Sequence, residues 1–307
     1  MKKALILVVL LLAVFIGELL IFDNKTETHD TKPYIAVTSF AIYDIANHIV
    51  ADQVEIKKLI PFGVEMHTYM PSVKTMTEIS KAEVFIFNGL GVEPWIKKEY
   101  PNQLDMSKSV RLQEAQDEEC EGHDDEGHEH HHENDADPHY WLDIDNMILM
   151  ADTISLRLSE HFPEHKVLFD ENTKAYISEL KKLDQEYVDS LQNCKHKEIV
   201  VNHNAFGYLG TKYGFSSHSV TGLSPDEQVS AKKMKEITDL VKSEDIKVVF
   251  FESFVSPEVA NTISKEAGAK AQSLQPLANV NEDEESKGYI GLMRDNLLKL
   301  QTAMECE

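Results

Sequence analysis

Residues 165–193 read HKVLFDENTKAYISELKKLDQEYVDSLQN, without a proline or a glycine. The apolar stripe of this stretch consists of Tyr176, Leu180, Leu183, Tyr187 and Leu191. Because these residues recur every three or four positions, they lie along one face of an unbroken α-helix. At about 1.5 Å per residue, the helix would be about 40 Å long. The sequence therefore predicts one long, stiff helix at 164–194, near the middle of the chain.

Short apolar runs alternate with amphipathic stretches on both sides of this helix. Before it, strands are expected at 34–38, 54–59 and 83–87, and helices at 41–50, 72–81 and 147–161. After it, strands are expected at 198–201 and 246–251, and helices at 205–213, 257–267 and 289–304, while SPDE at 224–227 is typical of a helix start. Strands that alternate with helices favour parallel sheets with crossover helices. We predict an α/β fold of two Rossmann-like lobes with parallel-type sheets, at 33–163 and 196–307, joined by the long rigid helix.

The length of the chain indicates how many domains it can form, and its net charge indicates which kinds of ligand it can attract. The chain has 307 residues, enough for two domains that each bury a core, and a net charge of −23. No stretch resembles a basic patch, so nucleic-acid binding is disfavoured. A strongly acidic protein attracts cations instead.

The first 22 residues read MKKALILVVLLLAVFIGELLIF, in which two lysines precede an apolar core at 4–16. This pattern is typical of a signal peptide. No small-residue cleavage site stands out, so we assign 1–24 to a signal peptide or an N-terminal anchor. The protein is expected to be exported to the periplasm, and to stay on the inner membrane if the segment is not cleaved. No cysteine lies near residue 20, and we expect no lipid-modified N-terminal cysteine.

A tract at 114–137 contains twelve acidic residues, five histidines and no Lys or Arg. Because ionised carboxylates stay in water and apolar residues are nearly absent, the tract predicts a disordered loop. Imidazole and carboxylate groups in such a loop bind divalent metals weakly, whereas the alternative is an acidic linker without a metal role. The expected weak ligands are His123, His128, His130, His131 and His132.

The chain has three cysteines, Cys120, Cys194 and Cys306. Cys120 lies in the acidic tract and is either a soft metal ligand or a free thiol. In an oxidising compartment, Cys194 and Cys306 can pair and join the end of the long helix to the C-terminus. An odd number of cysteines leaves this connectivity open.

Three further histidines lie in loops beside predicted strands or at the end of the tract. They are His67 in GVEMHTYMP, His139 in DPHYWLD and His203 in VNHNAFGY. In open parallel sheets, ligands bind beyond the carboxyl ends of the strands. Two of these histidines belong to the first lobe and one to the second, so a shared site would lie in the cleft. Each histidine taken alone is also compatible with an ordinary loop or capping role.

Most of residues 33–305 resembles the ZnuA-like metal-binding proteins of ABC importers, the cluster A-I solute-binding family. The matching stretches are GVEMHTYMPS, KAEVFIFNGLGVEPW, DPHYWLD, VNHNAFGYLGTKYGF, GLSPDEQVSAKKM, VVFFESFVSP, SLQPL and GYIGLMRDNLLKL. The acidic tract also falls where the zinc-handling members carry theirs. The resemblance implies two lobes, one long helix and a metal in the cleft, held by His67, His139 and His203.

The stretch LQPLA at 274–278 departs from the family pattern, because many members have an Asp or Glu there. The fourth metal position is therefore left to water, to Glu65 or to the amide oxygen of Gln275. Three imidazoles without a strong carboxylate suit tetrahedral zinc, so Zn²⁺ is expected in preference to manganese or nickel. Glu252 is either an acceptor for an imidazole N–H or an acid unrelated to the site.

The resemblance implies a periplasmic, high-affinity zinc-binding protein that captures Zn²⁺ and delivers it to the permease of an ABC importer. We expect a monomer that is not an enzyme and that meets the membrane only through its N-terminal segment. One alternative is a surface adhesin-like interaction protein of the same fold. Another is a metalloenzyme with a three-histidine zinc site, which the lack of an HExxH motif and of an evident general base other than Glu65 disfavours.

Overall fold

The computed structural model describes residues 32–115, 136–223, 229–252 and 257–307. Residues 34–307 form one compact unit. The signal or anchor segment, most of the acidic tract with Cys120, and the expected helix start at 224–227 lie outside the described residues. Among the helices of the described part, none is both long and apolar enough to cross a membrane.

Four strands in the first half of the chain form a parallel sheet. They are β1 (Tyr34–Val37), β2 (Glu55–Lys58), β3 (Val84–Phe87) and β4 (Gln103–Asp105), in the order β2-β1-β3-β4. Alternate residues of β1 and β3 face opposite layers, because side chains alternate along a strand. One face packs against α2 (Phe40–Val50) and α4 (Ile144–His161), and the other against α3 (Val73–Lys81). Both central strands are fully buried and read as continuous apolar runs, YIAV and VFIF.

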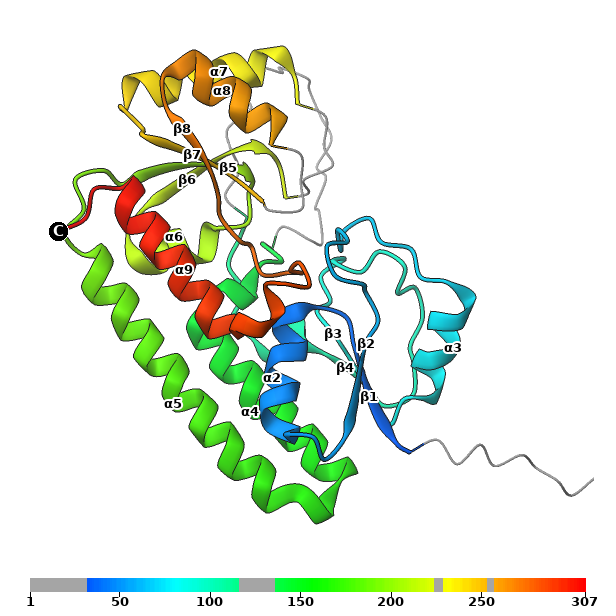
Figure 1. Cartoon of the computed structure of the whole chain (residues 1–307). Helices are drawn as coiled ribbons and strands as arrows, with labels where there is room; N and C mark the ends of the chain where they lie inside the picture. Colours follow the sequence, from blue (N-terminus) through cyan, green and yellow to red (C-terminus); the bar gives the residue numbers. More distant parts are fainter. Residues whose placement is uncertain (1–31, 116–135, 224–228, 253–256) are drawn as a thin grey trace, which may run out of the picture. The chain divides into compact units, whose positions relative to one another are not determined.

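A second parallel sheet repeats this arrangement after residue 196. Its strands are β5 (Glu198–His203), β6 (Ser216–Thr221), β7 (Val248–Phe251) and β8 (Lys270–Ser273), in the order β6-β5-β7-β8. Helices α7 (Ala231–Ser243) and α8 (Glu258–Ala267) cover one face, as Figure 1 shows. Helices α6 (Gly207–Tyr213) and α9 (Gly288–Ala303) belong to the core on the other side. The predicted α/β class with two parallel sheets is confirmed.

The predicted long helix is α5 (Lys166–Leu191), which is continuous. It buries the whole predicted stripe, from Tyr176 to Leu191. In Figure 1 it runs alongside α2, α4 and α9, and it contacts all three. Arg294 of α9 donates two hydrogen bonds of 2.8 Å to the carboxylate of Glu186 on α5. The helix therefore packs against elements from both halves of the chain.

Three strands of the structure have no counterpart in the sequence prediction. They are β4, β6 and β8, with the sequences QLD, SSHSVT and KAQS. Each of them lies at an edge of its sheet. Because an edge strand is covered on fewer sides than a central one, it can form without the apolar run on which the prediction depended.

Side-chain caps define the described starts of two helices. Helix α4 begins at Ile144, three residues before the predicted start, because the Asp143 carboxylate accepts a hydrogen bond from Asp145 N and caps the helix. Helix α7 begins at Ala231, where the Ser230 hydroxyl accepts from Lys233 N at 3.1 Å. The described start of α7 is thus a serine cap that lies after the SPDE stretch.

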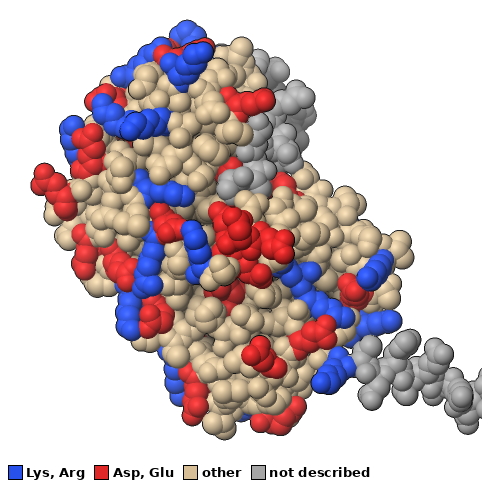
Figure 2. All heavy atoms as spheres, viewed as in Figure 1, with Lys and Arg blue, Asp and Glu red and all other residues tan. Residues whose placement is uncertain are grey.

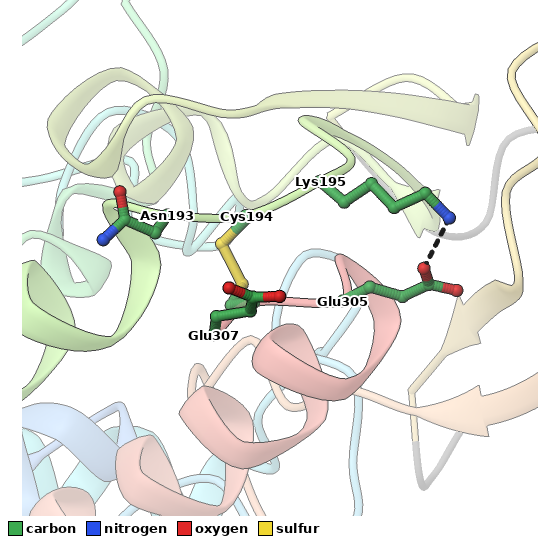
Figure 3. A pocket seen from close by; sticks show the side chains of 6 residues that line it. Asn193, Cys194, Lys195, Glu305 and Glu307 are labelled. Carbon is green, nitrogen blue, oxygen red and sulfur yellow. Dashed lines mark hydrogen bonds and ion pairs between the residues drawn. A yellow bond between two sulfur atoms is a disulfide. The ribbon is translucent and has the colours of Figure 1, made fainter.

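Cys194 and Cys306 form a disulfide, which settles the pairing that the sequence left open. Figure 3 shows the bond between the chain that follows α5 and the C-terminal residues, with Lys195 and Glu305 beside it. The Lys195 ammonium group lies 2.7 Å from a carboxylate oxygen of Glu305. The disulfide therefore joins the end of the long helix to the end of the chain.

Residues 274–281, which we call the crossing segment, lead from β8 to α9 and hydrogen-bond to the first half of the chain. Ala278 O accepts from Phe40 N at 2.9 Å, and Val280 O accepts from Gly63 N at 3.0 Å. Pro276 O accepts from the indole N–H of Trp141 at 2.7 Å. The following residues 282–285 are all acidic, and Figure 2 shows Asp and Glu side chains gathered over this region. The hydrogen bonds of the crossing segment therefore hold the last part of the chain against the start of α2, the loop after β2 and the 3₁₀ turn at Tyr140–Leu142.

Candidate metal centre

The structure brings the three predicted histidines together. His67 lies in the loop between β2 and α3, His139 directly precedes the short 3₁₀ turn Tyr140–Leu142, and His203 is the last residue of β5. One ring nitrogen from each lies within 4.8 Å of the other two. His139 and His203 are 0% and 3% exposed, and His67 is half-buried. The site therefore forms where both sheets present the carboxyl ends of strands, as expected for open parallel sheets.

The spacing of the ring nitrogens suits a metal ion. His139 Nε2 and His203 Nε2 are 3.3 Å apart. Two imidazoles on a tetrahedral zinc, with Zn–N bonds of about 2.0–2.1 Å, hold their nitrogens about 3.3 Å apart. His67 Nε2 is buried and has no hydrogen-bond partner among the described residues. A buried ring nitrogen without a partner is costly unless it binds something, so the cluster has the character of a ligand site.

His139 is oriented by Asp137. Oxygen Oδ1 of Asp137 accepts a hydrogen bond from the backbone N–H of His139 at 2.9 Å and lies 2.8 Å from Nδ1 of the ring. A carboxylate can only accept here, so Nδ1 carries the proton and Nε2 presents its lone pair to the cluster. Burial holds the pKa of His139 below its usual value, against the opposing effect of Asp137.

His203 is oriented by Glu252, the residue that follows β7. Glu252 is 2% exposed, and its Oε1 accepts from Nδ1 of His203. Burial alone would lower the pKa of His203, but the charge and hydrogen bond of Glu252 raise it above the usual value. Of the two roles considered for Glu252, the structure thus shows the acceptor for an imidazole N–H.

Among the described residues, no carboxylate is hydrogen-bonded to the ring of His67, and the described support of this residue comes through the backbone of its loop. Its N–H donates to Oε1 of Glu65 at 3.0 Å. The amide nitrogen of Asn279, in the crossing segment, donates to Pro61 O at 2.7 Å and to Val64 O at 2.8 Å. Burial, and then the two neighbouring histidines, lower the pKa of His67 to about 3. Its ring is therefore neutral near pH 7 and free to bind a metal.

The two side chains considered for a fourth ligand, Glu65 and Gln275, each form a hydrogen bond with a described residue. Among the His, Cys, Asp and Glu side chains of the described part, the cluster contains only the three histidines. Glu65 accepts the backbone N–H of His67, as above. The side-chain amide of Gln275 donates to Oε1 of Glu284 at 2.5 Å, and its backbone pairs with the Asn296 amide.

The structure describes only the two ends of the predicted disordered loop, 114–137. Glu114 and Ala136 form an antiparallel bridge, and Asp137 is only 3% exposed. The Asp137 carboxylate is buried because His139 and Gln113 donate to it, which offsets the loss of water. The five expected weak ligands, from His123 to His132, lie outside the described residues.

Sequence reasoning missed two residues that support the site. Asp137 was assigned to the acidic tract, although its position two residues before His139 is a signal that a carboxylate can reach the imidazole. Asn279 lies more than 200 positions from the loop that it holds, and no local pattern points to it.

The site can be compared with known proteins. Residues 35–303 match the model of the ZnuA family, described as zinc-uptake complex component A, periplasmic. The chain belongs to the ZnuA family. Among its ZnuA relatives, the zinc-binding lipoprotein AdcA of Streptococcus pneumoniae is 35% identical over 100% of this chain and 62% of its own length. The high-affinity zinc uptake system protein ZnuA of Bacillus subtilis is 32% identical over 92% of this chain and 90% of its own length. This chain thus spans about three fifths of the length of the AdcA relatives.

Solved structures of ZnuA-like proteins share the fold. The zinc-bound ZnuA-like domain of Streptococcus pneumoniae AdcA is 31% identical, with a TM-score of 0.73 over 90% of this chain and 100% of that one. The laminin-binding protein Lmb of Streptococcus agalactiae, described as bifunctional with adhesin and metal-transporting activity, is 26% identical. Its TM-score is 0.77, over 89% of this chain and 99% of that one.

Proposed function

We propose that this protein captures Zn²⁺ outside the cytoplasm and delivers it to the permease of an ABC importer. The observation that carries the proposal is the meeting of His67, His139 and His203, with one nitrogen of each within 4.8 Å of the others. The relatives named for zinc binding and zinc uptake support it. In this reading Zn²⁺ is the cargo, and the three imidazoles are the groups that hold it.

We propose zinc rather than manganese or nickel because of the donor atoms that the three histidines supply. Three neutral nitrogen donors without a carboxylate suit a tetrahedral ion, whereas manganese prefers oxygen ligands. The carboxylates of Asp137 and Glu252 accept from the Nδ1 atoms, so they orient the imidazoles. Water, Glu65 or Gln275 is proposed to complete the coordination.

The organisation of the chain supports a binding protein. We propose two lobes at 33–163 and 196–307 joined by a helix at 164–194, with the histidines contributed by both lobes. We further propose export through 1–24 to the periplasm, a monomeric state, and the permease as partner. The five tract histidines, from His123 to His132, are proposed as weak accessory ligands that raise the local concentration of Zn²⁺.

Zinc titration of the purified protein against a chelating competitor tests this function. The unmodified protein should bind one Zn²⁺ tightly and several weakly. Replacing His67, His139 and His203 together by Ala should abolish the tight site, and deleting 116–135 should remove only weak sites. If the triple variant kept the tight site, the assignment would be wrong. If the deletion removed it, a tract residue would be the missing ligand.

A second candidate function is adhesion, because the similar Streptococcus agalactiae structure is described as having adhesin as well as metal-transporting activity. Binding to immobilised laminin, compared between the wild type and the triple histidine variant, separates the roles. Laminin binding by both proteins would favour adhesion. A metalloenzyme is not proposed, because the relatives are named for zinc binding and uptake.

A further inference from the structure

The two ends of the acidic tract enter the folded protein side by side. We call residues 113–114 and 136–137 the stem. Glu114 and Ala136 form an antiparallel bridge, and Asp137 N donates to Gln113 O at 3.0 Å. Backbone hydrogen bonds therefore join the two chains of the stem, which includes Asp137, the residue that orients His139.

The side chain of Tyr208, in α6, holds both chains of the stem at once. Its hydroxyl accepts from Gln113 N at 3.1 Å and donates to Asp137 O at 3.0 Å. A phenol has one proton to donate and lone pairs to accept with, so this one hydroxyl pairs with a backbone group on each chain. Tyr208 is 5% exposed, so water has little access to replace it.

Helix α6 also contacts the carboxylate of Asp137 itself. A methyl group added to Gly207 would come within 2.8 Å of Oδ2 of Asp137, so the absence of a side chain at this position leaves room for the carboxylate. The other oxygen of Asp137 accepts from the backbone N–H and from Nδ1 of His139. A continuous series of contacts thus runs from α6 through Asp137 to the imidazole of His139.

We propose that Tyr208 is a positioning residue for zinc: by closing the stem it fixes Asp137, and Asp137 in turn aims Nε2 of His139 into the cleft. This inference rests on the proposed function, since it assigns a role within the same site. Helix α6 follows His203 after three residues. One short segment of the second half therefore carries one histidine and fixes another that belongs to the first half.

A second side chain of α6 strengthens this connection. Lys212 Nζ lies 3.2 Å from Asp143 Oδ1 and 2.9 Å from Asp184 Oδ1, so it contacts the start of α4 as well as α5. Asp143 lies four residues after His139 and caps α4. The helix that holds the stem is thereby held against the region that follows the histidine.

The variant Tyr208→Phe keeps the ring and removes both hydrogen bonds of the hydroxyl. We expect its Zn²⁺ affinity, measured by competition with a chelator, to fall by about tenfold, at the lower end of the effect of groups that support metal ligands. The matched control is Tyr213→Phe in the same helix, whose hydroxyl donates to Asp184 at 2.6 Å. The control should lose stability but keep its zinc affinity within about twofold. Unchanged affinity in Tyr208→Phe, or equal losses in both variants, would overturn the proposal.

A double-mutant cycle with Asp137→Asn tests whether Tyr208 acts through Asp137. If it does, the double variant binds zinc no more weakly than Asp137→Asn alone, whereas additive losses contradict that path. The absorption of bound Co²⁺ gives a second measurement, since a displaced His139 alters the ligand geometry but a purely structural loss does not. Gly207→Ala should alter the same spectrum, although alanine favours the helix.

The same experiments separate this inference from the proposed function. If the wild-type protein bound no zinc, or if His203→Ala bound it undiminished, the proposed function would fall. If the wild type binds zinc through its histidines and Tyr208→Phe binds it equally well, only the role of Tyr208 falls.

Discussion

The disulfide between Cys194 and Cys306 allows a quantitative prediction. The two residues are separated by 112 positions, so the bond closes a loop that contains the whole second sheet and α9. In the chain-entropy treatment, a closed loop of this length lowers the entropy of the unfolded chain by about 16 cal/mol/K, which stabilises the native state by about 4.8 kcal/mol at 25 °C. We therefore expect the Cys194→Ser/Cys306→Ser variant to lose most of this free energy of unfolding.

The proposed zinc site should be unaffected in the folded variant. The disulfide precedes β5 at its amino end, whereas His203 is the residue at its carboxyl end. A strand of six residues spans about 20 Å, so the loss of the bond does not reach the histidines directly. Zinc affinity of the variant below its unfolding temperature should stay within about twofold of the wild type.

Urea unfolding of the zinc-free protein measures the effect. Both proteins should carry Cys120→Ser, so that no free thiol exchanges with the bond. We expect a loss of about 3–5 kcal/mol and a melting temperature lower by on the order of 10 °C. A loss below about 1 kcal/mol would refute the loop-entropy reasoning. Weakened zinc binding in the folded variant would refute the separation of the bond from the site.

Further predictions concern the groups that support the three histidines. Glu252→Gln should lower zinc affinity about 10- to 100-fold in a competition assay, because an amide accepts more weakly from His203 than a carboxylate does; unchanged affinity would mean that Glu252 does not support the ligand. The pKa of His203 is raised above its usual value, whereas the pKa of His67, about 3, and the pKa of His139 are lowered. Below the raised pKa of His203, zinc binding should therefore release mainly the one proton of this ring, and zinc affinity should rise with pH over that range. Isothermal titrations from pH 5.5 to 8.5 in two buffers count that proton, and a slope of two or three protons would contradict these pKa directions. Asn279→Asp should lower the free energy of unfolding by about 3 kcal/mol in urea, because a carboxylate cannot donate to the two carbonyl groups that Asn279 binds. The same variant should also bind zinc more weakly, because the loop that carries His67 loses these two hydrogen bonds. If the variant were as stable as the wild type, the two hydrogen bonds would contribute little to the free energy of unfolding.

Local periodicity was sufficient for elements that bury a continuous apolar face or run. The stripe from Tyr176 to Leu191 predicted α5, and the runs YIAV and VFIF predicted the central strands β1 and β3, because a buried face must be apolar at the period of its element. The edge strands β4, β6 and β8 escaped prediction, since their position in the sheet demands less burial.

The candidate site, like the fold, was predicted from the sequence only in part. His67 and His203 were found from their place in loops beside predicted strands, and His139 from its place at the end of the acidic tract. A resemblance to one family then implied that all three are metal ligands. That reasoning did not decide which carboxylate accepts a hydrogen bond from which imidazole. Asp137 was assigned to a solvated tract, and Glu252 was either an acceptor for an imidazole N–H or an acid unrelated to the site. The structure assigns Asp137 to His139 and Glu252 to His203.

From its sequence alone, this protein could be recognised as two parallel α/β lobes about a long helix, with three histidines from both lobes at one site. Those conclusions depend on side-chain chemistry, on patterns within about 30 residues and on the resemblance to one family. The tertiary structure alone decided the disulfide, the edge strands, the anchoring of the His67 loop by Asn279 and the closing of the stem by Tyr208. The hydrogen bonds that position His203 and the His67 loop join residues 49 and 218 positions apart. Such pairs form only because packing of the apolar faces brings distant segments together. Local sequence spacing therefore does not predict which polar groups become hydrogen-bond partners.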